Sequence, residues 1–234
     1  MSEPTNTWEP IPPNERRVLG VLIEKQKTSK SADAYPMTLN SITIGCNQKS
    51  NRDPVLDLDE DTVEETLDTL QRRGLVMKMT GSRVDRYRHL LYELWKVTKT
   101  EMAVVAELVL RGSQTEGDLR GRASRMEEIK TLEELRDMLK SLAERKLVVY
   151  LSPPDRRGTM VTHGFYEPAE LDREKTKHAG GAVDPEPVAQ RTTSVPDTKY
   201  ADLQAEVVQL RENVKRLENE IAMIKVSLGM VKAI

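Results

Sequence analysis

The sequence predicts a mainly α-helical α+β protein, made of two tandem winged helix-turn-helix domains with small β-wings and a C-terminal coiled coil. Two observations support this fold. An amphipathic helix that runs into a short apolar strand occurs twice, at residues 63–76 and 135–148, and each apolar position of the first copy recurs 72 residues later, as Val63 and Leu135 illustrate. A heptad pattern of apolar residues then occupies residues 199–232.

The first winged-helix domain is predicted at residues 12–95. Residues 1–11 are polar and contain several prolines, so we expect a disordered tail before it. Apolar residues at helical spacing predict three helices, and alternating residues around a glycine-containing turn at 81–83 predict a two-stranded wing. The predicted elements are helices at 13–27, 38–46 and 59–73, and strands at 75–79 and 86–91.

The second domain is predicted at residues 96–171 and repeats this order. Thr38 and Thr115 open equivalent short helices, each followed by apolar residues at the same spacing. The order of three helices, strand, turn and strand is typical of winged-helix proteins. The predicted elements are helices at 101–111, 115–123 and 131–146, and strands at 147–151 and 160–165.

The C-terminal part is predicted to be a flexible linker at 172–198 followed by the coiled coil. The linker loses apolar periodicity and gains Gly, Pro, Ser and Thr. β-branched residues at heptad position a and mostly Leu at position d favour a parallel two-stranded form, so we expect a homodimer. The seam residues are Leu203, Val207, Leu210, Val214, Leu217, Ile221, Ile224 and Leu228.

The composition indicates a soluble cytoplasmic protein without a metal or cofactor. Lys and Arg number 36 against 38 Asp and Glu, so there is no overall basic excess. A single cysteine excludes an intramolecular disulfide, and the three histidines lie far apart in sequence. No signal peptide, membrane span, Gly-rich phosphate loop or HExxH motif is present. We therefore predict no catalytic residues, no enzyme activity and no membrane partner.

One segment resembles a known family. Residues 46–55 read CNQKSNRDPV, with Glu24-Lys25 and Tyr35-Pro36 before them and residues 111–115 (RGSQT) after them. Over about residues 8–170 the chain resembles the YceH-like family of bacterial proteins. The resemblance implies tandem winged-helix domains, a bacterial cytoplasmic setting and no established biochemical role.

The unusual loop within this block has two interpretations. Its polar side chains can tie down the backbone, which makes a structural loop the first interpretation. A binding site for a small ligand or a partner is the second. The loop residues concerned are Asn47, Asn51, Arg52, Asp53 and Pro54. Cys46, at the end of an apolar series, is predicted to fill the core rather than act as a nucleophile.

The leading functional hypothesis is a homodimeric, DNA-associated regulator. In winged-helix proteins the wing contacts the DNA backbone or the minor groove. In this chain, basic residues gather in both predicted hairpins. A further basic group, which ends at Arg125, lies in and just after the second helix of the second domain. The candidate duplex-DNA contacts are Arg83, Arg86, Arg88, Arg120, Arg122, Arg156 and Arg157.

The alternative is a scaffold that binds another protein. The third helix of the first domain is rich in carboxylates, which repel the phosphate backbone of DNA. Such a helix is suited either to plain solvent exposure or to a basic protein partner. The candidate partner-binding residues are Glu60, Glu64, Glu65 and Asp68.

Overall fold

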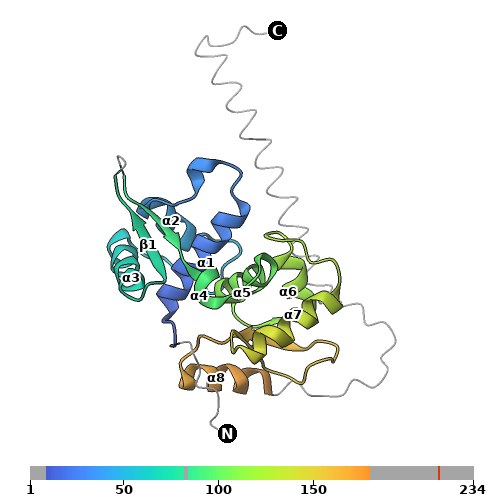
Figure 1. The fold of residues 1–234 in the computed structure, drawn as a ribbon. Coiled ribbons are helices and arrows are strands. Elements are labelled where there is room, and N and C mark those ends of the chain that lie inside the picture. The colour runs from blue at the N-terminus through green and yellow to red at the C-terminus, as the bar shows by residue number, and fades with distance from the viewer. Residues whose placement is uncertain (1–8, 82–83, 180–215, 217–234) are drawn as a thin grey trace. The chain divides into compact units, whose positions relative to one another are not determined.

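The structure is a computed structural model that describes residues 9–81, 84–179 and Arg216. The predicted coiled-coil seam from Leu203 to Leu228, and the predicted linker beyond Ala179, lie outside the described residues. The described part is mostly helical with two small antiparallel sheets, which confirms the α+β class (Figure 1).

The first half contains three helices and a hairpin. A 3-10 turn at Ala32–Ala34 links the first two helices, and an isolated antiparallel bridge joins Met37 to Tyr87 in the hairpin. The elements are α1 (Pro13–Thr28), α2 (Leu39–Cys46), α3 (Glu60–Arg72), β1 (Val76–Met79) and β2 (Arg86–His89).

The second half repeats this order with a three-stranded sheet of order β3-β5-β4. The pair Gln114 and Val161 in this sheet corresponds to the bridge between Met37 and Tyr87 in the first half. The elements are α5 (Lys99–Arg111), β3 (Gln114–Thr115), α6 (Glu116–Ala123), α7 (Leu132–Glu144), β4 (Val148–Tyr150) and β5 (Met160–His163).

Side chains of Thr and Asp begin most of these helices. Five N-cap residues accept a hydrogen bond from the backbone N–H three positions later, which satisfies a donor that the helix itself leaves free. Thr98 and Glu101 form a reciprocal capping box at α5. The capping residues are Thr38, Asp59, Thr98, Thr115 and Thr131.

The repeated helices α3 and α7 also end in the same way. After α3 the Leu75 N–H donates to Leu70 O, and after α7 the Leu147 N–H donates to Leu142 O, each at 2.9 Å. Both turns need one residue in the left-handed region, which is Gly74 (φ 70°) in the first copy and Lys146 (φ 57°) in the second. The repeat in the sequence is therefore a repeat of backbone geometry.

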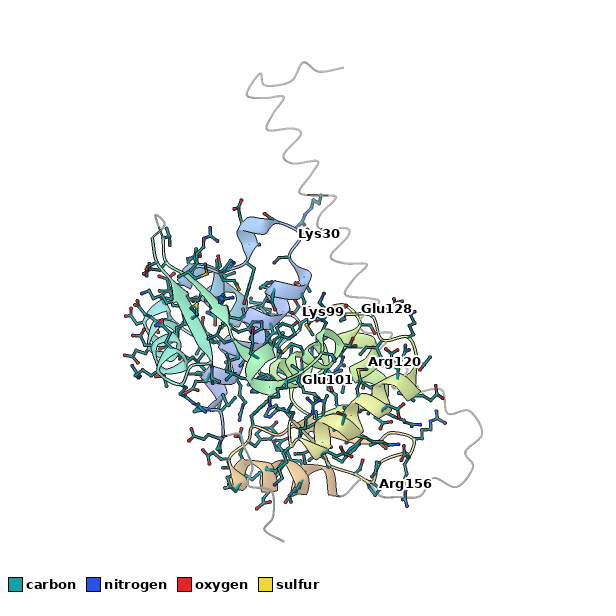
Figure 2. All side chains as sticks on the ribbon, in the orientation of Figure 1. Lys30, Lys99, Glu101, Arg120, Glu128 and Arg156 are labelled. Carbon is teal, nitrogen blue, oxygen red and sulfur yellow. The ribbon has the colours of Figure 1, made fainter. Side chains whose placement is uncertain are left out.

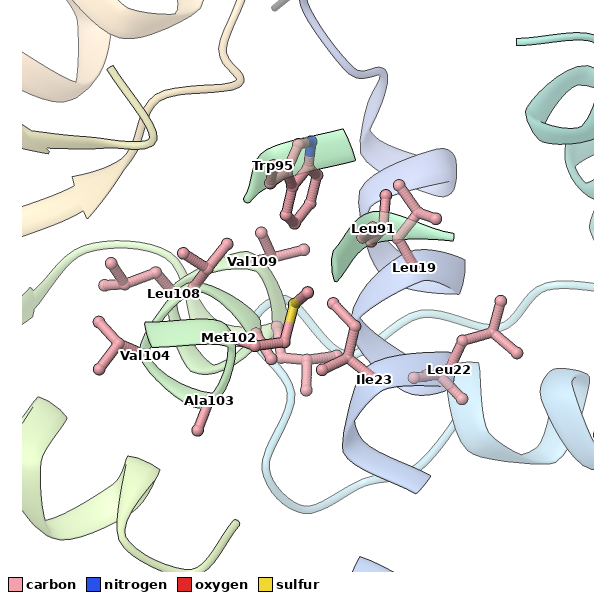
Figure 3. Packing of buried hydrophobic residues seen from close by; sticks show 14 of the residues in the cluster. Leu19, Leu22, Ile23, Leu91, Trp95, Met102, Ala103, Val104, Leu108 and Val109 are labelled. Atoms are coloured by element: carbon pink, nitrogen blue, oxygen red, sulfur yellow. The ribbon is translucent and has the colours of Figure 1, made fainter. Parts of the chain in front are cut away.

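Helices α1 and α5, the first helices of the two halves, pack against each other at the centre (Figure 3). Ten consecutive residues of α1, Glu15–Glu24, and ten of α5, Glu101–Leu110, are buried. Gly20 allows the close approach, because a Cβ there would lie 2.7 Å from Leu110 Cδ2. The two halves thus share one hydrophobic core.

Several element boundaries differ from the sequence prediction. Ile11, placed in the predicted tail, is buried, and its N–H donates to Phe165 O at 2.9 Å. Strand β2 ends at His89 because Leu91 begins a short helix, α4 (Leu91–Trp95), that the pattern does not show. Helix α8 (Pro168–Ala179) crosses the predicted boundary at 171/172. Its sequence is polar, so periodicity alone resembles a linker, but Glu170 pairs with Arg16 of α1.

Two buried histidines occupy equivalent places after the second strand of each hairpin. The Leu91 N–H donates to His89 Nδ1, and the Phe165 N–H donates to His163 Nδ1, both at 3.3 Å. Burial, followed by the charges of Lys27 and Arg88, lowers the pKa of His89 to about 4. Burial also lowers the pKa of His163. Both imidazoles are therefore neutral in the folded protein at neutral pH.

The contact at Gly20 leads to a paired prediction. Gly20→Ala should destabilise the protein by about 1–3 kcal/mol, because overpacking at Leu110 outweighs the better helix propensity of Ala. Gly121→Ala, in α6 with nothing within 4 Å of its added Cβ, should stabilise by about 0.5–1 kcal/mol. Urea unfolding of both variants measures the difference, and stabilisation by both would contradict the tight α1–α5 contact.

The histidines predict a loss of stability in mild acid. Between the unfolded pKa near 6.5 and the folded pKa, the unfolded chain binds more protons, so the free energy of unfolding falls as the pH falls. For His89 the loss between pH 7 and pH 5 should be about 2 kcal/mol. Denaturant unfolding at both pH values should show a smaller loss for His89→Gln than for the control His178→Gln. An equal loss in both variants would contradict this assignment.

Candidate functional site

Helix α3 has one apolar face and one acidic face. Asp59 caps the helix by accepting from the Thr62 N–H at 2.8 Å, and hydrogen bonds from Thr62 lower the pKa of the Asp59 carboxyl. Val63, Leu67 and Leu70 are buried. The opposite side, which we call the acidic face, is exposed and makes no ion pair with any described residue. It consists of Asp61, Glu64, Glu65 and Asp68.

Glu60 lies at the start of the same helix and is also exposed. Its Oε1 accepts from Asn40 Nδ2 of α2 at 3.0 Å, so this carboxylate helps to hold α2 beside α3. Glu64 contributes to the electrostatic environment of Tyr87 on the wing, which shows that the acidic face borders the hairpin. Of the four predicted partner-binding residues, Glu64, Glu65 and Asp68 therefore belong to one free surface.

The first hairpin has fewer free basic side chains than its sequence indicates, because several are bound by other groups of the protein. Lys78 pairs with Asp85 at 2.9 Å. Arg86 donates from Nη1 to Asp33 O at 2.7 Å and to Pro36 O at 2.8 Å, so it fastens the loop before α2. Arg88 is exposed and lies opposite Met77, whose Sδ is 3.6 Å from Arg88 Nη2. Arg83 lies outside the described residues.

The outward positions of β1 and the turn carry apolar side chains. Met77, Met79 and Val84 are 41%, 44% and 53% exposed. Apolar side chains at these positions offer no charge to a phosphate backbone.

The arginines near α6 are bound within the protein. Arg120 donates to Ile129 O at 3.2 Å and to Lys130 O at 3.4 Å, and Arg122 donates to Gln114 Oε1 at 2.8 Å. Arg125 donates to Glu24 Oε1 at 2.6 Å and to Glu107 Oε2 at 3.0 Å. These three side chains hold the second half together and join it to α1.

The second hairpin keeps its arginines exposed. Arg156 and Arg157 lie in the turn between β4 and β5, and neither side chain has a hydrogen bond or an ion pair with a described residue. Figure 2 shows Arg156 at the end of this hairpin, well apart from Arg120. Of the six predicted DNA-binding arginines that the structure describes, Arg86, Arg120 and Arg122 are thus bound by groups of the protein itself, and only Arg88, Arg156 and Arg157 are exposed.

The loop at 47–54 is anchored to the body by its side chains and backbone. Asn47 exchanges two hydrogen bonds with the backbone of Leu58, at 2.7 and 2.8 Å. The Asp53 N–H donates to Leu110 O at 3.0 Å, and Asn51, in the left-handed region, accepts from Arg111 Nη2 at 2.6 Å. Pro54 O accepts from Arg17 at 2.6 Å. The loop thus connects the first half to the end of α5.

Arg52 brings this loop to a buried carboxylate. Its guanidinium is fully buried and binds Glu24 through two hydrogen bonds, of 2.5 and 3.2 Å. Arg125 reaches the same carboxylate from the second half. Burial alone raises the pKa of the Glu24 carboxyl, but its hydrogen bonds with Arg52 and Arg125 outweigh this effect and lower it.

Sequence reasoning did not find this network as a unit. Arg125 appears in the sequence as one of several basic residues near α6, and the loop residue Arg52 has no visible partner. A usable signal was present, because Glu107 interrupts a long apolar helical run and Glu24 directly follows one. A carboxylate in such a run is buried only when a cation pairs with it.

The nucleophile and metal candidates are few. Burial raises the pKa of the Cys46 thiol to about 12, so it is not a thiolate at neutral pH. Within the described ranges, no group of three His, Cys, Asp or Glu side chains could hold a metal ion. Over the same residues, no helix has both the length and the apolar character needed to cross a membrane.

Comparison with known proteins places the chain in a family. A family model described as protein of unknown function, DUF480, matches residues 11–158. A UPF0502 protein of Rhodopirellula baltica is 43% identical over 180 residues, 75% of each chain. UPF0502 proteins of Hahella chejuensis and Shewanella pealeana are 38% and 34% identical, over 88% and 89% of this chain and 93% and 99% of their own. The chain therefore belongs to the DUF480 family, which confirms the kinship that its 46–55 segment indicates.

Proposed function

We propose that this protein is a non-enzymatic, cytoplasmic interaction protein with two tandem winged-helix halves, and that the acidic face of α3 binds a basic segment of a partner protein. The winged-helix assignment is supported by the repeated order of helices, small sheet and hairpin. The partner assignment is supported by one observation above all, that Glu64, Glu65 and Asp68 are exposed and unpaired by any described cation.

Electrostatics favours a basic protein over DNA at this surface. α3 occupies the position of the recognition helix, and its carboxylates repel the phosphate backbone. Arg86, Arg120 and Arg122, which the DNA hypothesis needs, are engaged by groups of the protein itself. A cationic segment of a partner gains from the exposed carboxylates, because no cation among the described residues pairs with them.

Contact with duplex DNA is the second candidate. Arg156 and Arg157 at the exposed turn are the residues that favour it, with Arg88 on the first hairpin. Three arginines on two hairpins supply a weak, salt-sensitive contact with phosphates rather than a surface that recognises a base sequence. This mode would leave the acidic face without a role.

The proposed dimer rests on the heptad seam. Burying each apolar seam residue against a second copy gains roughly 1.5–3 kcal/mol, whereas a lone helix of this length is marginal in water. A coiled coil would present two acidic faces per assembly and so increase the avidity for a repeated basic partner.

Reversing charge on α3 should weaken partner binding. Glu64→Lys with Glu65→Lys should weaken binding of a Lys- and Arg-rich peptide to the full chain by roughly tenfold. The matched control, Glu133→Lys with Asp137→Lys, places the same charges on the exposed side of α7 and should change binding little. Fluorescence anisotropy over a salt series measures both. Equal loss in the two variants, or duplex binding that depends on Arg156 and Arg157 alone, would contradict the proposal.

Breaking the heptad seam should dissociate the dimer. In the full chain, Leu210→Glu with Leu217→Glu buries charges in the seam and should give a monomer by multi-angle light scattering. Ala205→Glu with Gln209→Glu places the same charges at outward heptad positions and should leave the dimer intact. A dimer that survives the seam substitutions would move the interface to the described body.

A further inference from the structure

A cleft of about 400 Å³ lies where the two halves meet helix α8. Its walls come from five segments: the start of α1, residues 53–56, the end of α5 with the residues after it, residues 163–166, and one side of α8. Four cations line it, Arg16, Arg17, Arg111 and Lys177. A cavity of this size is in the range that holds a small organic ligand.

Arg17 is a buried cation to which no carboxylate of the described residues is bound. The residue is 3% exposed, and its guanidinium donates to two backbone carbonyls, Cys46 O at 3.0 Å and Pro54 O at 2.6 Å. Burial, followed by the charge of Arg52, lowers the pKa of Arg17. Arg125 shows the contrast, since burial alone lowers its pKa but Glu24 and Glu107 outweigh this and raise it.

Arg111 adds a second incompletely bound guanidinium. Its Nε is buried and has no hydrogen bond, and neither has the nearby Glu107 Oε1, although the two atoms are only 3.2 Å apart. The poor alignment leaves a charge contact without the hydrogen bond that would normally accompany it. The neighbouring Gly112 (φ 73°) turns the chain so that Ser113 also lines the cleft.

Helix α8 already places carboxylates on donors of this cleft. Glu170 accepts from Arg16 through two hydrogen bonds, of 2.5 and 2.9 Å. Glu174 accepts from Ser113 Oγ at 3.0 Å and pairs with Lys177 on its own helix. Two donors in the walls, Arg16 and Ser113, thus each bind a carboxylate of α8, whereas Arg17 binds no carboxylate of the described residues.

We propose that this cleft binds a small oxyanion, a phosphate or carboxylate group, through Arg17 and Arg111. Each guanidinium keeps N–H groups beyond those that bind the protein, and two such forks match the geometry of a planar or tetrahedral oxyanion. Three carboxylates also line the cleft, Asp53, Glu170 and Glu174, so binding of an oxyanion works against their charge. The site is separate from the acidic face of α3 and does not depend on the proposed partner.

Calorimetric titration of the full chain tests the proposal, with inorganic phosphate and with malonate as probes at constant ionic strength. The wild type should bind at least one of them at millimolar concentration. Arg17→Gln should weaken binding by about ten- to a hundredfold, because a hydrogen-bonded charge is lost. The exposed control Arg157→Gln should leave it unchanged. Tighter binding of phosphate identifies a phosphorylated ligand, and tighter binding of malonate a carboxylate.

A second variant guards against a folding defect in Arg17→Gln. Glu174→Gln keeps an acceptor for Ser113 but removes a negative charge beside the site, so it should tighten binding about three- to tenfold. A purely structural role for Glu174 would change stability without this gain in affinity. Failure of the wild type to bind either probe, or unaltered affinity in Glu174→Gln, would overturn the proposal.

Discussion

The close packing of α1 against α5 at Gly20 is the constraint on which the rest of the structure depends. Each of these helices is the first of its half, and each is buried along ten consecutive residues. A helix enclosed in this way has no solvent face for its polar groups. Glu24 of α1 and Glu107 of α5 are consequently buried as well, at 3% and 0% exposure. Joining the halves therefore buries two carboxylates, which need cations from other segments to pair with them.

Pairing of these two carboxylates engages two arginines from distant segments of the chain. Unpaired buried carboxylates are costly, and removing one partner of a buried pair is far more damaging than never having the pair. Arg52 from the 47–54 loop and Arg125 from the segment after α6 converge on Glu24, and Arg125 continues to Glu107. One unusual loop and one apparent DNA-binding patch are thus parts of the same junction. What remains on the surface of the first half is mainly acidic.

The sequence predicts those features that depend on local pattern. Helices α3 and α7, with one buried stripe each, are found within one or two residues of the predicted limits at all four ends, because the spacing of their apolar residues follows the buried side of the helix. Helix α8 is missed because its stabilising contacts, such as Glu170 with Arg16, join residues 154 positions apart. The roles of Arg86 and Arg120 are missed for the same reason, since a side chain that binds backbone carbonyls leaves no pattern in the sequence. The cleft at Arg17 is missed because five segments that are separate in the sequence build it.

The two copies of the repeat share their backbone geometry but differ in the charge of their outward residues. Their backbones end α3 and α7 with the same hydrogen bonds, although the second copy uses Lys146 where the first has Gly74, a substitution that costs conformational energy in the left-handed region. The shared geometry is therefore held by packing rather than by local preference. Packing leaves the outward residues unconstrained, and there α3 is acidic whereas α7 mixes both signs, with Arg136 bound to Glu116 at 2.8 Å. The repeat therefore conserves the fold but not the surface charge, which is acidic and exposed on α3 and mixed on α7.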